Sequence, residues 1–236
     1  MPAACFKCLE DQDRVRDGEF AERRREARIK YLKSVSGLGA KWVDASFDSF
    51  KTDLDSLHKM RKVQYKPAYL PAMRNCKNAI MDWGSKFQDH RKTGRSLVVL
   101  GDVGTGKNHL TSALINYVIE NFFTRCLFTS VTQIFLELKD SFSRSDVSEK
   151  SILDKFTSVG LLVVNEVGLN AGTDYEFEKI NYILNERIDQ RLPFVLVSNL
   201  SSEQLALAVG DRLADRIAEH PVLNFKWPSF RPDGSR

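Results

Sequence analysis

The stretch Ser96-Leu-Val-Val-Leu100-Gly101-Asp-Val-Gly-Thr-Gly106-Lys107-Asn108 decides the fold of this 236-residue chain. An apolar strand leads into a glycine-rich loop, and a helical pattern begins at Lys107. This order is the context of a P-loop, because glycines let consecutive N–H groups point inward and the helix adds its positive end. Lys107 then reaches the β and γ phosphates. The stretch predicts a nucleotide site within an α/β fold.

The expected ATP-binding residues follow one another along this loop. They are Gly101, Val103, Gly104, Thr105, Gly106, Lys107, Asn108 and His109. P-loops place Ser or Thr after the lysine, where its hydroxyl binds Mg²⁺, whereas this chain has Asn108. An amide carbonyl is still a hard oxygen ligand, so Asn108 remains a candidate magnesium ligand. A purely structural turn is the alternative, and it leaves Lys107 unexplained.

A second polar pair ends the apolar run Gly160-Leu-Leu-Val-Val-Asn165-Glu166. The Asp that usually holds the water shell of the metal is here Asn165, which keeps the shape and loses the charge. Asn165 is the second candidate magnesium ligand, and Glu166 is available to polarise the attacking water. Because an amide weakens a divalent metal site, we expect nucleotide binding and leave hydrolysis open. Slow turnover supported by Asn165 through a hydrogen bond is the alternative.

Three more catalytic candidates follow Glu166 along the chain. Asn199 comes after a buried strand, so it is expected at the sheet edge beside the γ phosphate, although it could simply cap that strand. Arg212 and Arg216 lie four residues apart on one predicted helix and therefore share a face. They either form an ordinary salt-bridged surface with the neighbouring aspartates or reach the γ phosphate of an adjacent subunit as an arginine finger.

Short apolar runs alternate with helical patterns through the rest of the chain, which indicates a five-stranded parallel sheet covered on both faces. The expected strands are 96–100, 126–129, 161–165, 194–198 and 222–225. The expected helices are 72–87, 107–121, 131–142, 148–157, 175–190 and 203–218. We divide the chain into an N-terminal extension and linker, residues 1–65, and a nucleotide-binding domain, residues 66–236.

The N-terminal extension has its own character. Residues 19–33 are rich in arginine and helix formers but poor in apolar residues, which predicts a small helix that is either solvated or waiting for a partner. Ser36-Gly37-Leu38-Gly39 predicts a hinge or turn, and Trp42, Phe47 and Phe50 are expected to pack back on the main domain. Cys5 and Cys8 have zinc-site spacing, but no second ligand pair follows, so free thiols are favoured and zinc stays open.

Composition places the chain among soluble proteins. Hydrophobic residues make up 42% and charged residues 28%, and no apolar run is long enough for a membrane span. The N-terminus lacks the apolar core of a secretion signal, so we expect a cytoplasmic protein with no membrane contact. A net charge of +4 permits contact with nucleic acid but does not establish it.

Five motifs together resemble the DnaC-type replicative helicase loaders of the AAA+ superfamily: GDVGTGKNHL, LLVVNEVG, LVSNLS, GDRLADRI and KWPSFR. The similarity runs from about residue 36 to 231, and Asn108-His109-Leu110 points to this branch. The resemblance implies an AAA+ core without a helical lid, with ATP and Mg²⁺ as cofactors. It also implies a protein that oligomerises and delivers a DnaB-type helicase onto single-stranded DNA, gripping the helicase with its N-terminal segment.

The resemblance also implies residue roles. Lys107 corresponds to the phosphate-binding lysine, Glu166 to the catalytic acid, Asn199 to the sensor and Arg216 to the arginine finger, with Arg212 as an accessory. Phe142 and Phe177 occupy places where such loaders contact single-stranded DNA, although an aromatic residue at helical spacing is more often part of the core. Two alternatives remain: a catalytically weak adaptor or inhibitor of the helicase or its loader, and an IstB-like transposition helper ATPase.

Overall fold

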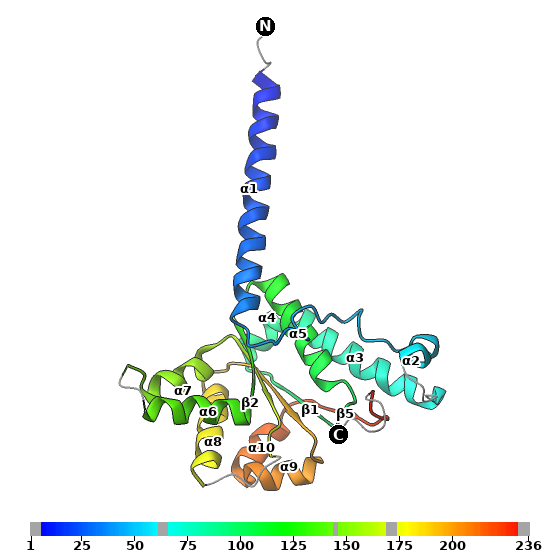
Figure 1. Cartoon of the computed structure of the whole chain (residues 1–236), viewed down its shortest axis with the longest axis vertical. Coiled ribbons are helices and arrows are strands. Elements are labelled where there is room, and N and C mark those ends of the chain that lie inside the picture. Colours follow the sequence, from blue (N-terminus) through cyan, green and yellow to red (C-terminus); the bar gives the residue numbers. More distant parts are fainter. Residues whose placement is uncertain (1–5, 61–65, 144–145, 169–173, 231–236) are drawn as a thin grey trace.

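A parallel sheet of five strands in the order β2-β3-β4-β1-β5 forms the centre of the molecule (Figure 1). The computed structural model describes residues 6–60, 66–143, 146–168 and 174–230. The strands are β1 (Leu97–Gly101), β2 (Cys126–Ser130), β3 (Leu161–Asn165), β4 (Phe194–Ser198) and β5 (Val222–Phe225). The five predicted strands and their parallel pairing are therefore confirmed.

Helices cover both faces of the sheet. Alternate residues of β1 point to opposite faces, so Leu97 and Val99 join one apolar core while Val98 and Leu100 join the other. The first core lies against α3 and α5, and the second against α6, α7 and α8. The helices are α1 (Phe6–Ser34), α2 (Leu54–Met60), α3 (Leu70–Ser85), α4 (Phe87–Thr93), α5 (Lys107–Phe122), α6 (Val131–Phe142), α7 (Glu149–Ser158), α8 (Asp174–Asp189), α9 (Ser202–Val209) and α10 (Asp211–Ala218).

One predicted helix is wrong. The sequence pattern runs without interruption through residues 203–218, but the structure contains two helices, α9 and α10, that meet at Gly210. Gly210 has a φ of 82°, and its N–H donates to the carbonyl of Ala206 and so ends α9. A Cβ at this position would lie 2.9 Å from the Phe177 ring. Only glycine satisfies both the backbone conformation and the close approach of that ring.

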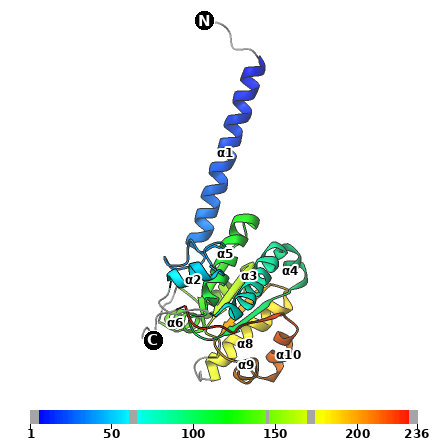
Figure 2. The same ribbon diagram turned by 90° about the vertical axis from the view of Figure 1, so that its right-hand side faces the viewer.

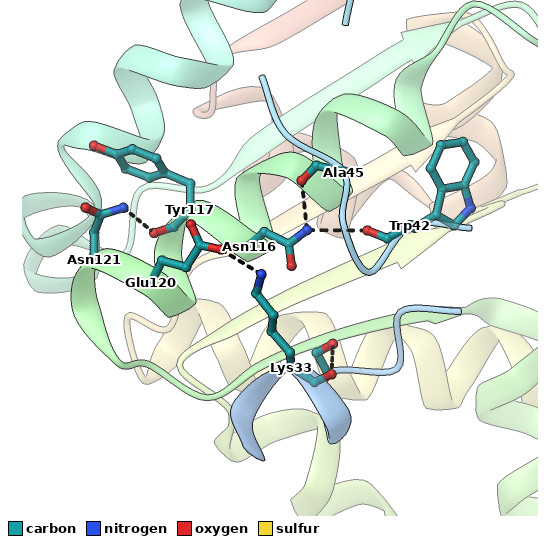
Figure 3. Close-up of polar contacts among 8 residues, drawn as sticks. Lys33, Trp42, Ala45, Asn116, Tyr117, Glu120 and Asn121 are labelled. Atoms are coloured by element: carbon teal, nitrogen blue, oxygen red, sulfur yellow. Dashed lines mark hydrogen bonds and ion pairs between the residues drawn. The ribbon is translucent and has the colours of Figure 1, made fainter. Parts of the chain in front are cut away.

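Helix α1 extends away from the body of the molecule, as Figures 1 and 2 show. Its base is attached by Leu32, which is buried, and by Lys33, whose Nζ lies 2.6 Å from Glu120 Oε1 on α5 (Figure 3). Beyond the base, the side chains of residues 19–31 are mostly exposed. No helix within the described ranges combines the length and apolar character needed to cross a bilayer.

The segment after α1 is docked on the domain. Gly37 forms the predicted turn with a φ of 74°, and the carbonyl of Ser36 accepts a hydrogen bond of 2.7 Å from Phe128 N–H on the edge strand β2. Asn116 Nδ2 of α5 donates to the carbonyls of Ala45 at 2.8 Å and Trp42 at 3.3 Å (Figure 3). Buried Phe47 and Phe50 belong to the core of the main domain. The expected packing of this segment is confirmed, while the boundary at residue 65 stays a prediction.

The cysteines divide between two parts of the chain. Cys5 and the side chain of Cys8 lie outside the described residues, so zinc binding by this pair stays an open prediction. Cys76 and Cys126 are free and buried. Burial raises the pKa of the Cys76 thiol to about 11 and raises that of Cys126 as well. Both side chains therefore act as small apolar groups of the core.

Candidate nucleotide-binding site

The loop between β1 and α5 has the backbone of a phosphate cradle. Gly104 and Gly106 have φ values of 81° and 89°, in the left-handed region that favours glycine. Gly106 is the N-cap of α5, and a Cβ there would lie 2.6 Å from Phe50 Cε2. The loop therefore turns its backbone toward the N-terminus of a 16-residue helix, where N–H groups and the helix dipole favour an anion.

Lys107 lies inside this loop with only 6% of its surface exposed. Its Nζ donates to the carbonyls of Gly101 at 2.5 Å and Asp102 at 2.8 Å, and to Asn199 Oδ1 at 2.6 Å. Asn199 follows β4, the neighbour of β1 in the sheet, so the strand order brings together two residues that are 92 positions apart. The sequence placed both residues at the phosphates, and the structure joins them directly.

A C-terminal segment clamps the loop. Trp227, which is buried, donates from Nε1 to the carbonyl of Thr105 at 3.0 Å, and Phe230 N–H donates to the carbonyl of Gly104 at 2.6 Å. The rings of Phe230 and Phe50 meet edge to face with centroids 5.6 Å apart. Sequence reasoning assigned no role to Trp227 or Phe230, although their motif KWPSFR supported the resemblance. Two segments, one ending at Phe50 and one at Phe230, therefore contribute to the shape of the site.

His109 joins α5 to the N-terminal segment. Its Nε2 lies 2.7 Å from Ser49 Oγ, and its ring meets Trp42 and Phe50 with centroid distances of 5.9 and 5.6 Å. Burial lowers the pKa of His109, and the carbonyl of Ser46 partly opposes this effect. His109, predicted as an ATP-binding residue, therefore fixes Trp42 and Phe50 of the N-terminal segment against the start of α5.

In the described part of the chain, the two predicted magnesium ligands, Asn108 and Asn165, are not accompanied by a cluster of carboxylates. Asn108 lies in the first turn of α5 and Asn165 is the last residue of β3, and both are half-buried. Glu166 is exposed and has a left-handed φ of 63°. Within the described residues, no group of three or more His, Cys, Asp or Glu side chains is arranged to hold a metal. The donor chemistry of two neutral amides does not fit the carboxylate-and-hydroxyl site of a P-loop ATPase.

The two arginines of α10 have different surroundings. Arg216 Nη1 donates to Asn185 Oδ1 at 2.6 Å, and Nη2 forms an ion pair of 2.5 Å with Asp189, so Arg216 joins α10 to α8. Arg212, one turn earlier, is exposed. The partners of Arg216 lie on α8 and not among the aspartates of its own helix, which were one of the two alternatives left open by the sequence.

Phe142 and Phe177 lie on α6 and α8, with exposed fractions of 64% and 46%. The ring centroids of Phe142 and Tyr175 lie 6.2 Å apart. Phe177 lines a groove of about 730 Å³ between α6, α8 and α9, together with Glu166, Lys139, Leu136 and Leu207. Ile180 and Leu184, which follow Phe177 at helical spacing on α8, are buried, so Phe177 lies where the core meets the surface.

A family model described as IstB-like ATP binding protein matches residues 79–231, which include β1, the loop, α5, β3 and β4. The chain belongs to this family. The match covers the phosphate cradle and the C-terminal clamp up to Phe230. The family name supports ATP as the ligand of the site.

The chain is also similar to several DnaC proteins in sequence and in structure. The chain is 26% identical over 225 residues to the replicative helicase loader DnaC of Buchnera aphidicola subsp. Acyrthosiphon pisum (strain APS), covering 94% of this chain and 83% of that protein. It is 32% identical over 138 residues to DnaC of Escherichia coli (strain K12), covering 58% of this chain and 56% of that protein. A crystal structure of the DnaC helicase loader superposes with a TM-score of 0.66 at 20% identity, covering 80% of this chain and all of that one. The predicted resemblance and the AAA+ fold are confirmed.

Proposed function

We propose that this protein binds ATP at residues 101–109 and, in the cytoplasm, delivers a DnaB-type replicative helicase onto single-stranded DNA. The observation that carries the proposal is the similarity to DnaC over 94% of the chain, which extends from the N-terminal segment to the C-terminal clamp. A nucleotide-binding domain alone would be shared by proteins of many activities. The similarity of the extension together with the domain favours a loader over a transposition helper.

ATP binding is supported by the state of Lys107. Its buried ammonium group donates to two carbonyls of the loop and to Asn199 Oδ1. When a triphosphate binds, Lys107 exchanges these acceptors for phosphate oxygens. No buried charge has to be created for the nucleotide to bind. Asn199 is then released beside the phosphates, which suits a residue that reports the state of the nucleotide to β4.

Helix α1 is the surface we assign to the helicase. Phe20 and Tyr31 expose 63% and 65% of their surface, and Arg23, Arg24 and Arg28 give the described half of the helix a basic character. Most side chains of residues 19–31 are exposed, and such a helix is expected to gain stability in a complex. Beyond its base, α1 projects from the body in Figure 2, where a ring-shaped partner could reach it.

The DNA surface we assign lies at the ends of α6 and α8. Phe142, Tyr175 and Phe177 offer aromatic faces there, and Lys139 lies in the adjoining groove. Stacking of bases on aromatic rings next to a cation holds a single strand without regard to sequence. Glu166 lines the same groove, so a strand bound at Phe177 would lie beside the residue proposed to orient the attacking water.

The experiment mixes the purified protein with the replicative helicase of its source and measures the mass of the complex by gel filtration with light scattering. We expect a stable complex for the full chain and none for a chain lacking residues 1–30. This cut removes most of α1 but keeps Leu32, Ser36 and the docked segment, so the domain stays folded. A complex that survives the truncation would show that the helicase is held elsewhere.

A catalytically weak adaptor is the second candidate, and Asn165 is the residue that favours it. Both candidates bind the helicase, so they differ in what happens on DNA. In a loading assay with single-stranded DNA coated by its binding protein, a loader increases helicase unwinding, whereas an inhibitory adaptor decreases it. Phe142→Ala and Phe177→Ala should each weaken single-strand binding, with Tyr182→Ala, another exposed aromatic of α8, as the matched control.

A further inference from the structure

At two positions where a P-loop ATPase has metal ligands, this chain has asparagines. Asn108 lies in the first turn of α5, where a hydroxyl normally coordinates Mg²⁺, and Asn165 ends β3, where a carboxylate normally stands. Sequence reasoning kept both residues as weakened metal ligands. Their position in the structure suggests a different use.

An amide differs from a carboxylate in what it offers to a phosphate. The carboxylate only accepts hydrogen bonds, so near a triphosphate it needs a cation between the two negative groups. The amide NH₂ group donates hydrogen bonds and carries no charge. With Asn165 at the end of β3, a phosphate without a metal ion meets a donor where it would otherwise meet a like charge. Asn108 offers the same donor from the first turn of α5.

The positive charge of the site is supplied by the protein itself. Lys107 is buried within the loop, and the N-terminus of α5 points its dipole at the same place. Two carboxylates of this region, Asp102 in the loop and Glu166 directly after β3, are both exposed to solvent. Glu166 lines the groove between α6, α8 and α9. Solvent screening weakens the repulsion that such exposed groups exert on an anion.

We propose that this site binds ATP as the free anion as readily as it binds the magnesium complex, with Asn108 and Asn165 acting as donors to the phosphates. The inference rests on the proposed ATP binding and names the ligand species that the site takes. A nucleotide switch of this kind responds to the concentration of ATP without requiring a metal ion to complete the site.

The test compares ATP affinity with excess MgCl₂ and with excess EDTA. Tryptophan fluorescence serves as the readout, because Trp227 donates a hydrogen bond to Thr105 in the loop, and calorimetry provides an independent measurement. For the natural chain we expect dissociation constants that agree within about threefold in the two buffers. For Asn165→Asp we expect affinity in EDTA to fall about tenfold or more, with most of it recovered in Mg²⁺.

A matched variant separates the effect of a negative charge at the phosphate site from that of a negative charge elsewhere on the protein. Asn121→Asp makes the same chemical change at the exposed far end of α5, and it should leave the two affinities equal. A natural chain whose ATP affinity falls about tenfold in EDTA would overturn the inference.

The proposed function fails in a different way. If neither buffer supports ATP binding, or if Lys107→Ala binds ATP as well as the natural chain does, the loop is not a nucleotide site and the inference falls with it. If ATP binds only with Mg²⁺ and Lys107→Ala abolishes this binding, the nucleotide site stands and only the metal-independent use of the amides is wrong.

Discussion

Arg187 illustrates how a single side chain can hold the sheet together away from the phosphate site. It is fully buried and donates to the carbonyls of Phe156 at 2.8 Å, Val159 at 2.9 Å and Pro193 at 2.7 Å. These carbonyls belong to the segments that lead into β3 and β4. Burial lowers the pKa of the guanidinium to about 9. Because three acceptors depend on one donor group, Arg187 fixes the entry of two neighbouring strands.

Arg187→Met is expected to lower the free energy of unfolding by about 3 kcal/mol, because it leaves three buried carbonyls without their donor. Urea denaturation followed by circular dichroism measures the change. Arg125→Met, at an exposed position, should change stability by less than about 0.5 kcal/mol. Equal effects of the two substitutions would show that Arg187 is not the anchor.

His109 predicts a pH dependence of stability. Burial keeps the pKa of its folded form below the ordinary value of 6.5, so the unfolded chain takes up the proton more readily. The contribution of His109 is therefore complete above about pH 6.5 and is lost as pH falls through the lower pKa of the folded state. His90 and His220 are shifted in the same direction by burial. All three favour a protein that weakens in mild acid.

His109→Gln should reduce the loss of stability between about pH 7.5 and about pH 5.5, because glutamine does not titrate in this range. The measurement is the free energy of unfolding in urea at both pH values. The variant keeps the slope contributed by His90 and His220, so a partial reduction is expected. An unchanged slope would mean that His109 is free to take up a proton in the folded protein.

At the scale of elements, the junction at Gly210 sets the direction of α10. The backbone of Gly210 closes α9 and opens α10, since the N–H of Ala214 donates to its carbonyl at 2.9 Å. Leu213 and Ile217 bury the inner side of α10, and Arg216 attaches it to Asn185 and Asp189 of α8. This arrangement fixes α10 through one arginine and leaves the other, Arg212, at the surface.

Arg216→Ala should therefore act on stability, and Arg212→Ala on assembly. We expect a loss of about 1 kcal/mol for Arg216→Ala and coupling to Asp189→Ala in a double-mutant cycle. Arg212→Ala should change stability by less than about 0.5 kcal/mol but weaken ATP-dependent oligomers in gel filtration. If Arg216→Ala alone abolishes the oligomers without loss of stability, Arg216 is the residue that acts on the neighbouring subunit.

At the scale of the whole molecule, a segment that follows α1 and a segment that follows β5 meet at the P-loop. Phe50 from the N-terminal segment and Phe230 from the C-terminal segment touch beside Gly106. His109 binds Ser49, and Trp227 binds Thr105, so the loop is held from two directions. The segment at 36–50 thereby connects α1, which we propose to hold the helicase, to the nucleotide site.

This connection predicts unequal effects of two truncations. Removal of residues 1–30 should leave the thermal unfolding midpoint nearly unchanged, because the side chains removed are mostly exposed. Removal of residues 1–52 should cost about 3 kcal/mol or more, since it also removes buried Phe47 and Phe50 from the core. Circular dichroism during heating measures both. Equal midpoints for the two chains would show that the docked segment contributes nothing to the domain.

The sequence by itself determined the sheet and the cradle, because both follow from local rules. Val98 and its neighbours form a buried strand by composition, and Gly106-Lys107 after such a strand has few other uses. Sequence alone also placed Asn199 at the same edge of the sheet. The prediction of one helix over residues 203–218 was wrong at Gly210, because the helical pattern continues there although the backbone turns.

Only the tertiary structure decided which distant groups meet. The pairing of Lys107 with Asn199, of Arg216 with α8 and of Trp227 with Thr105 depends on strand order and on the path of the chain. Such contacts leave no periodicity in the sequence, because their partners are separated by tens of residues and each partner alone is compatible with many environments. The packing of Phe50, Trp227 and Phe230 against one loop is therefore a property of the folded molecule.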